Sequence, residues 1–168
     1  MKYFMLRQGD GYDRNPIVKN WYGKIDMHSL RRRGMDSEQR NMFYVSATDN
    51  TIYPDMIMDP VFMVSEAMRN VIAMYEKQAV YREVFFLDPV KGDGHIYYIP
   101  FLPVVDCIQK GAMRDRKNIR LDEIGKEKLQ NYNIAEADIP DRQCVIVSLD
   151  FAESVLRKEL TGIGLKEI

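Results

Sequence analysis

The amino-acid sequence predicts a single α+β domain, with a mixed or largely antiparallel sheet and at least two packed helices. Short apolar runs bounded by glycine, proline and asparagine recur along the 168 residues, which is typical of strands. Two further segments have apolar residues at helical spacing and recognisable starting residues. No linker or low-complexity segment divides the chain, so we expect one domain over residues 1–168.

The composition indicates a globular protein that remains in the cytoplasm. Hydrophobic residues make up 46% of the chain and charged residues 29%, which is enough to build a proper core. The net charge of −1 gives no general attraction to nucleic acid or to an anionic membrane. No apolar run has the length of a signal peptide or a membrane span. In this compartment we expect Cys107 and Cys144 to be reduced thiols.

The first third of the chain predicts two strands with a weakly patterned stretch between them. Lys2–Leu6 is a short apolar run that ends at the turn residues Gly9, Asp10 and Gly11. Met42–Ala47 is the second strand-like run. Between them, Trp21 and Tyr22 could start a further strand.

The first helix is predicted to begin at Ser65, a favourable N-cap residue with Glu66 in the first turn. Its apolar residues fall on one face at helical spacing: Val64, Met68, Val71, Ile72 and Tyr75.

A hairpin is predicted to follow this helix. Val84–Leu87 is a continuous apolar run, as expected of a strand that is covered on both faces. The glycines of Lys91–Gly94 turn the chain into a second strand at Ile96–Ile99. Pro100 and Pro103 should make this strand bend, end or lie at an edge.

The C-terminal segment predicts a strand, a helix and a final strand. After a weaker strand at Asn118–Asp122, the run Cys144–Val147 leads to a helix with Asp150 as N-cap and Glu153 reaching back to it. Gly162 should end this helix and precede the last strand. The apolar stripe of the helix consists of Phe151, Val155 and Leu156.

No arrangement of residues specifies a reaction, a metal or a cofactor, and we expect none. Asp88, Asp93, His95 and Asp106 lie on or near the predicted hairpin and could form an acid–base cluster, but no metal-binding motif is present. A small hydrolase that uses Asp88, His95 and Asp106 is therefore an alternative function. The two cysteines adjoin apolar runs, which favours buried packing residues over nucleophiles.

A basic stretch gives a second alternative, a regulator that binds nucleic acid. It contains no aromatic residue for base stacking, and nearby acidic residues partly offset its charge, so we do not expect nucleic acid as the partner. Its basic residues are Lys110, Arg114, Arg116, Lys117 and Arg120.

Three segments together resemble a family of bacterial immunity proteins from polymorphic toxin systems, of the immunity-protein-eleven type, formerly a domain of unknown function. The first is Val64-Ser65-Glu66 at the start of a helix. The second is the paired strands around Val84–Asp88 and Tyr97–Ile99, followed by Val105-Asp106-Cys107. The third is the terminal unit from Val145 to Ile163. The resemblance is clearest from about residue 60 to residue 168.

The resemblance implies a cytoplasmic protein that binds a cognate toxin stoichiometrically and neutralises it, without catalysis. It implies no catalytic residues. The toxin-binding surface is expected where the family pattern is least evident, at Trp21, Tyr22, Arg31, Arg32, Arg33, Met56 and Met58. For Met56 and Met58 the competing interpretation is that they fill an irregular core.

Overall fold

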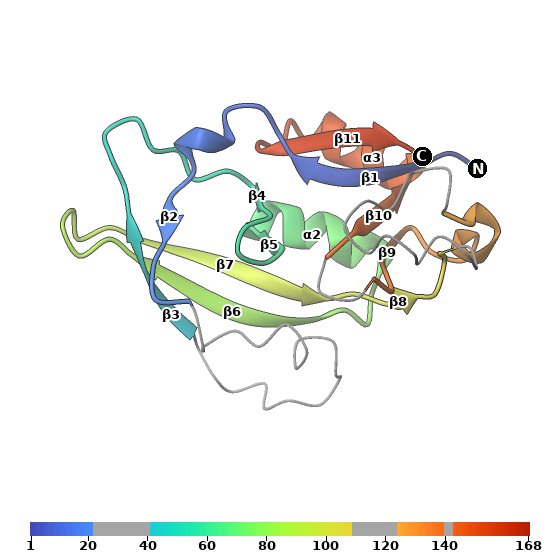
Figure 1. Cartoon of the computed structure of the whole chain (residues 1–168), viewed down its shortest axis with the longest axis horizontal. Coiled ribbons are helices and arrows are strands. Elements are labelled where there is room, and N and C mark those ends of the chain that lie inside the picture. Colours follow the sequence, from blue (N-terminus) through green and yellow to red (C-terminus); the bar gives the residue numbers. More distant parts are fainter. Residues whose placement is uncertain (22–40, 109–123, 140–142) are drawn as a thin grey trace.

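The computed structural model describes residues 1–21, 41–108, 124–139 and 143–168. These residues form two α-helices and eleven strands, and the strands make two mixed sheets (Figure 1). The predicted α+β class is confirmed, although the strands divide between two sheets where the sequence suggested one. Among the described residues, neither helix has the length and apolar character needed to span a membrane.

In the five-stranded sheet, β1 (Tyr3–Gln8), the first strand of the chain, is the second strand from one edge. β1 lies antiparallel between β10 (Val145–Ser148) and β11 (Ile163–Glu167). β9 (Ile134–Ala137) pairs with the other side of β10, and β8 (Val104–Val105) runs parallel to β9 at the edge. The predicted first and last strands are therefore confirmed, and they are neighbours.

The six-stranded sheet is built around the predicted hairpin, which is confirmed. β6 (Val80–Leu87) and β7 (Gly94–Phe101) pair antiparallel along their full length. β7 ends one residue after Pro100, as expected from the missing amide donor of proline. The remaining strands are β3 (Asn41–Ser46), parallel to β6, then β2 (Ile17–Val18), β5 (Met63–Val64) and β4 (Met56–Ile57).

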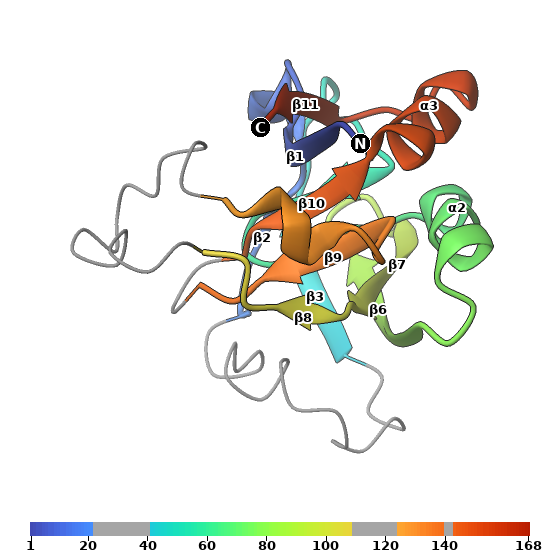
Figure 2. The same ribbon diagram turned by 90° about the vertical axis from the view of Figure 1, so that its right-hand side faces the viewer.

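The two helices pack against each other beside the sheets (Figure 2). α2 (Glu66–Tyr75) begins at Ser65, whose hydroxyl accepts a hydrogen bond from the Met68 amide over 3.2 Å, so the predicted cap is confirmed. The Tyr75 hydroxyl lies 2.7 Å from the Ser154 hydroxyl of α3 (Leu149–Arg157), and the two form a hydrogen bond. This contact joins the end of α2 to the middle of α3.

The start of the second helix differs from the prediction. Ser148 is the N-cap, and its hydroxyl accepts from the Phe151 amide over 3.3 Å. Asp150 lies inside the first turn, where its charge faces the positive end of the helix. The prediction was wrong because Asp150 and Ser148 are both good caps, and the sequence alone does not show where β10 ends.

The end of this helix was also predicted wrongly in two respects. The helix stops at Arg157, and Glu159 takes the left-handed conformation with a φ of 53°. Gly162, with a φ of 76°, instead forms the turn into β11. There a Cβ would lie 2.5 Å from the Cβ of Pro54, so the position excludes a side chain. Leu156, which was predicted to be part of the apolar stripe, is 63% exposed. The buried residues of the helix are Phe151, Ala152 and Val155.

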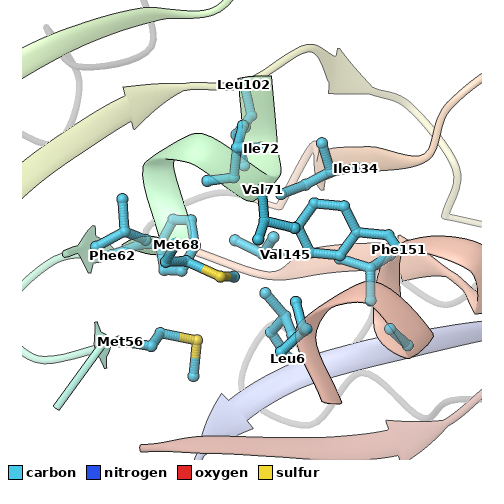
Figure 3. Close-up of a cluster of buried hydrophobic side chains, with 14 residues drawn as sticks. Leu6, Met56, Phe62, Met68, Val71, Ile72, Leu102, Ile134, Val145 and Phe151 are labelled. Carbon is cyan, nitrogen blue, oxygen red and sulfur yellow. The ribbon is translucent and has the colours of Figure 1, made fainter. Parts of the chain in front are cut away.

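A central core fills the space between the two helices and the two sheets (Figure 3). α2 contributes Met68, Val71 and Ile72, and α3 contributes Phe151, all completely buried. A second cluster lies on the other face of the five-stranded sheet and contains both cysteines. A third cluster is formed by the six-stranded sheet on the face away from α2 and includes Phe43, Val45, Val84, Phe86 and Tyr97.

Candidate functional site

The hairpin of β6 and β7 is longer than the helix that covers it. α2 has ten residues and is therefore about 15 Å long, whereas the eight-residue strands span about 26 Å. The helix contacts the half of the hairpin that contains Tyr81 and Tyr98: the Tyr81 hydroxyl reaches the Arg69 carbonyl at 3.5 Å, and the Arg69 guanidinium lies 4.3 Å from the centre of the Tyr98 ring. The other half of the hairpin extends past α2 (Figure 1).

The uncovered half carries an apolar surface, which we call the outer sheet face. Side chains alternate between the two sides of a strand, and Phe85 and Ile96 pair directly, so both lie on the same side as Tyr98. On this side β3 adds Met42, which pairs with Phe85, and Tyr44, which pairs with Leu87. The outer sheet face consists of Met42, Tyr44, Phe85, Leu87 and Ile96.

Solvent reaches this face to an extent unusual for such residues. Met42 is 47% exposed, Tyr44 45% and Ile96 48%, while Phe85 and Leu87 are partly exposed. None of the five side chains is charged, and the partly exposed Glu83, two residues before Phe85 on the same side of β6, borders the face next to Tyr98. Contiguous apolar surface of this kind marks interaction sites, and aromatic residues and methionine are enriched at the centre of protein interfaces.

The outer sheet face has a rigid support. On the opposite side of the same strands, Phe43, Val84 and Phe86 are fully buried in the third cluster. β6 pairs with β3 on one side and with β7 on the other. The five side chains are therefore held on a fixed backbone, which lowers the entropy that a partner would have to remove on binding.

Gly94 shapes the outer end of the face. A Cβ at this position would lie 2.4 Å from Cζ of Phe85, so the phenyl ring rests directly over the glycine. The backbone of Gly94 is not in the left-handed region, in contrast to Gly92 in the turn, where φ is 73°. The glycine is thus required here by the position of the Phe85 ring and not by the backbone.

Asp88 fixes the end of the hairpin that carries this face. It is only 1% exposed, and its Oδ1 accepts from the amides of Val90 and Lys91 over 2.9 and 3.2 Å. The Val90 amide is the main reason that the pKa of Asp88 is lowered, and burial acts in the opposite direction. Lys91 pairs with Asp49 over 3.0 Å, and this hydrogen bond raises the pKa of the lysine.

The structure does not bring together the residues of the alternative hydrolase site. His95 lies in β7 and stacks on Tyr53 with ring centres 3.5 Å apart. Asp106 is exposed and pairs with Lys128 over 3.6 Å. It follows β8, beyond the far end of β7, and the seven residues from His95 to Phe101 alone span about 20 Å. Among the described residues, no group of three metal-ligating side chains is found.

The sequence-predicted binding residues lie elsewhere. Met56 is completely buried in the central core, and Met58 packs against the same core, so the structure corrects the expectation that Met56 contacts a partner and supports its role as a core filler. Trp21 is partly buried against the third cluster. Tyr22 and Arg31, Arg32 and Arg33 lie outside the described residues, as do the predicted strand at 118–122 and the basic stretch from Lys110 to Arg120.

The outer sheet face was not predicted, because the continuous apolar run Val84–Leu87 indicates a strand that is covered on both sides. Only Val84 and Phe86 are buried, while Phe85 and Leu87 remain partly exposed. The length of the predicted helix could have revealed this, since ten helical residues cover little more than half of an eight-residue strand.

No protein-family model matches this chain, and a search of curated proteins also finds no match.

Proposed function

We propose that this protein is a cytoplasmic immunity protein that binds a cognate bacterial toxin through the outer sheet face and blocks its activity. The observation that carries the proposal is the exposed, uncharged surface formed by Met42, Tyr44, Phe85, Leu87 and Ile96 on a rigid sheet. An inhibitor of this kind needs a complementary surface and no reacting groups.

A stable complex would have to contact residues around the outer sheet face as well as the face itself. Stable protein–protein complexes bury about 1,200–2,000 Å² in total, which is more than five side chains provide. The apolar residues would form the centre of the interface, where a few anchors supply most of the binding energy. Polar residues at both ends of the face, Arg69 next to α2 and the Lys91–Asp49 pair at the turn, would form its rim.

The motifs behind the family resemblance also support the proposal. They lie at the β5–α2 junction, in the β6–β7 hairpin, just after β8, and in the terminal unit of β10, α3 and β11. These elements build the central core and position the hairpin that carries the outer sheet face. A shared scaffold with an exposed recognition surface is the design expected of an inhibitor that must match one partner.

Growth rescue tests the proposal. The toxin domain encoded by the neighbouring gene should arrest growth when expressed alone, and co-expression of this protein should restore it. The Ile96→Lys variant should fail to rescue, because a lysine would place an unpaired charge in the centre of the interface. Met74→Lys is the matched control: Met74 is 59% exposed on α2, comparable with Ile96, and its variant should rescue growth fully.

Co-purification separates inhibition from catalysis. The two proteins should elute together at a fixed ratio, and rescue should require at least as much of this protein as of toxin. Rescue by far smaller amounts, without a complex, would indicate turnover by an enzyme. If a folded wild-type protein does not protect against the neighbouring toxin, the immunity function is refuted.

A further inference from the structure

We propose that β11 pairs edge to edge with β11 of a second copy of this chain, so that two five-stranded sheets join into one across a two-fold axis. The inference goes beyond the proposed function and does not depend on it, because the outer sheet face belongs to the other sheet. It is carried by the outward backbone groups of β11, by the self-complementary order of its side chains and by an exposed leucine of α3.

The outer edge of β11 offers a row of backbone hydrogen-bonding groups. The Ile168 amide donates to the Tyr3 carbonyl of β1 over 3.1 Å. Because backbone groups alternate in direction along a strand, Ile163, Leu165 and Glu167 point their N–H and C=O groups away from β1. Within the described part of the chain β11 is the last strand of its sheet, so these donors and acceptors are open to an additional strand.

A second copy of β11 satisfies all of these groups in one register. Antiparallel pairing centred on Leu165 places Leu165 opposite its own counterpart and Ile163 opposite Glu167 of the second copy, and each such pair exchanges both of its N–H···O bonds. A shift of two residues in one direction brings Lys166 opposite Lys166 of the second copy, where the like charges repel. The opposite shift leaves Glu167 beyond the end of the other strand. The centred register is therefore preferred.

The side chains of the joined strands match in the same register. On the side of the central core, Leu6 of β1 lies next to Leu165, and the second copy continues this apolar row with its own Leu165 and Leu6. Leu165 is only partly buried in the single chain, so pairing would complete its burial. On the other side of the sheet Lys166 faces Gly164 of the second copy, which leaves room for the lysine to extend into solvent.

The charged groups of β1 and β11 permit this pairing. On the core side, Glu167 is paired with Lys2 of the same chain over 3.2 Å. On the other side the charged residues of the two strands are Arg7 and Lys166, and both are exposed. In the joined sheet Lys166 lies two strands, or about 10 Å, from Arg7 of the second copy, where water and salt screen their repulsion.

An exposed leucine of α3 lies beside the same edge. The Tyr75 hydroxyl of α2 bonds to the Ser154 hydroxyl, so this flank of α3 faces α2. Leu156 lies about 200° around the helix from Ser154 and therefore on the opposite flank. Figure 1 and Figure 2 both show α3 level with β11 and α2 further from it, so this flank borders the space beyond β11. Leu156 is 63% exposed, and its neighbours Glu153 and Arg157 have opposite charges.

These features favour a second copy over an unrelated strand. The outward backbone groups, the row of Leu6 and Leu165 and the exposed Leu156 would each meet the same group on the other chain. A two-fold pairing of this kind uses each β11 edge once, so the association closes at two copies.

Sedimentation velocity of the full chain over a range of concentrations tests the inference. Glu167→Pro removes an amide that the single chain does not use and that each copy donates in the dimer. It should weaken dimerisation at least about tenfold, whereas Glu167→Ala loses the same side chain, keeps the amide and should change the affinity less than about threefold.

A second pair of variants tests the contribution of α3. Leu156→Lys should weaken the dimer at least about tenfold, because it places a charge beside its own counterpart. Met74→Lys changes a residue of similar exposure, 59%, on α2 and should leave the dimer intact. Circular dichroism and thermal unfolding establish that each variant is folded.

Hydrogen exchange measured by nuclear magnetic resonance identifies the paired edge. In dilute protein the amides of Ile163, Leu165 and Glu167 should exchange rapidly, while those of Gly164 and Lys166 are protected by β1. At concentrations where the dimer forms, the first three amides should become protected as well.

Several results would overturn the inference. A wild-type chain that remains monomeric up to about 1 mM has no such contact. A dimer that tolerates Glu167→Pro, or one that forms without protecting the amides of Ile163 and Leu165, uses another surface. A dimer that Ile96→Lys dissociates would place the second copy on the outer sheet face.

Discussion

The side-chain amide of Gln8 is hydrogen-bonded to the backbone of Met56, which belongs to the other sheet. Gln8 Nε2 donates to the Met56 carbonyl over 3.0 Å, and Gln8 Oε1 accepts from the amide of Met58 over 2.9 Å. The same Nε2 donates to the carbonyl of Gly162 over 3.0 Å. Gln8 thus bonds to the edge strand β4 as a neighbouring strand would, and it links the two sheets through one side chain.

Replacing Gln8 by leucine should destabilise the fold without altering its architecture. The Gln8→Leu variant removes the Gln8 hydrogen bonds to the Met56 carbonyl and from the Met58 amide, while the Gly162 carbonyl keeps its bond from the Gly9 amide. We expect a loss of about 2 kcal/mol in the free energy of unfolding. Urea denaturation measures this loss. The neighbouring Arg7 is exposed, and Arg7→Ala should change the stability by no more than about 0.5 kcal/mol. Equal midpoints for both variants would contradict the role of Gln8.

The cap of α3 gives a second prediction. Ser148→Ala should cost about 1 kcal/mol or more, because Ser148 is fully buried, caps the helix and donates to Oδ1 of Asn133 over 2.8 Å. Asp150→Ala should cost only a few tenths of a kcal/mol, since it removes a charge from the first turn and no cap. Thermal or urea unfolding of the two variants decides the order. A larger loss with Asp150→Ala would restore Asp150 as the cap.

Gly94→Ala should reshape the outer sheet face while the protein remains folded. The backbone of Gly94 accepts alanine, and the atom that the new methyl group meets is the far end of the Phe85 ring, which can rotate away. We expect little change in the melting temperature and a clear loss of toxin binding or of growth rescue. Calorimetric titration with the toxin domain would measure the loss. Unchanged affinity would show that the Phe85 ring does not contribute to binding.

The lowered pKa of Asp88 gives a pH dependence with a definite sign. A carboxyl whose pKa is lower in the folded state stabilises the fold at pH values above its unfolded-state pKa of about 3.9, and this contribution disappears as the pH falls through the folded-state value. Asp88→Asn should therefore be less stable than the wild type at pH 7, and the difference should shrink below about pH 4. A difference that stays constant between pH 7 and pH 3 would show that the carboxylate charge makes no contribution.

Both cysteines should resist thiol reagents in the native protein. Cys107 and Cys144 are free and buried, and burial raises the pKa of the Cys107 thiol because it disfavours the thiolate. An aromatic disulfide reagent should label neither cysteine rapidly at pH 8, and it should label both in denaturant. Rapid labelling of the native protein would mean that the second cluster opens readily.

Local patterns predicted those elements whose apolar spacing and boundary residues agree. Ser65 and the stripe of Met68, Val71 and Ile72 define α2, and the glycine-rich turn defines the hairpin. The division into two sheets was not predictable, because it depends on pairings between distant segments, such as Phe4 with Glu167. The N-cap of α3 was predicted wrongly for a different reason. Ser148 and Asp150 are both adequate caps, and which of them caps the helix depends on where β10 ends.

The candidate site could not be predicted from local sequence patterns. Ile96 and Phe85 look like core residues in the sequence, but α2 is too short to cover them, so Ile96 is exposed and Phe85 partly exposed. Met56 shows the converse, since its methionine-rich surroundings suggest a binding surface and the fold buries it completely. Exposure in this protein depends on where a helix ends relative to a sheet, which is a property of the assembled fold.

The position of β1 determines when the five-stranded sheet can form during synthesis. β1 is translated more than a hundred residues before the two strands that flank it, β10 and β11. Until the ribosome has released them, the apolar side of β1 has no permanent neighbour. The sheet must therefore close after translation of the C-terminal unit, and its dependence on such distant contacts makes folding slow and the nascent chain prone to aggregate.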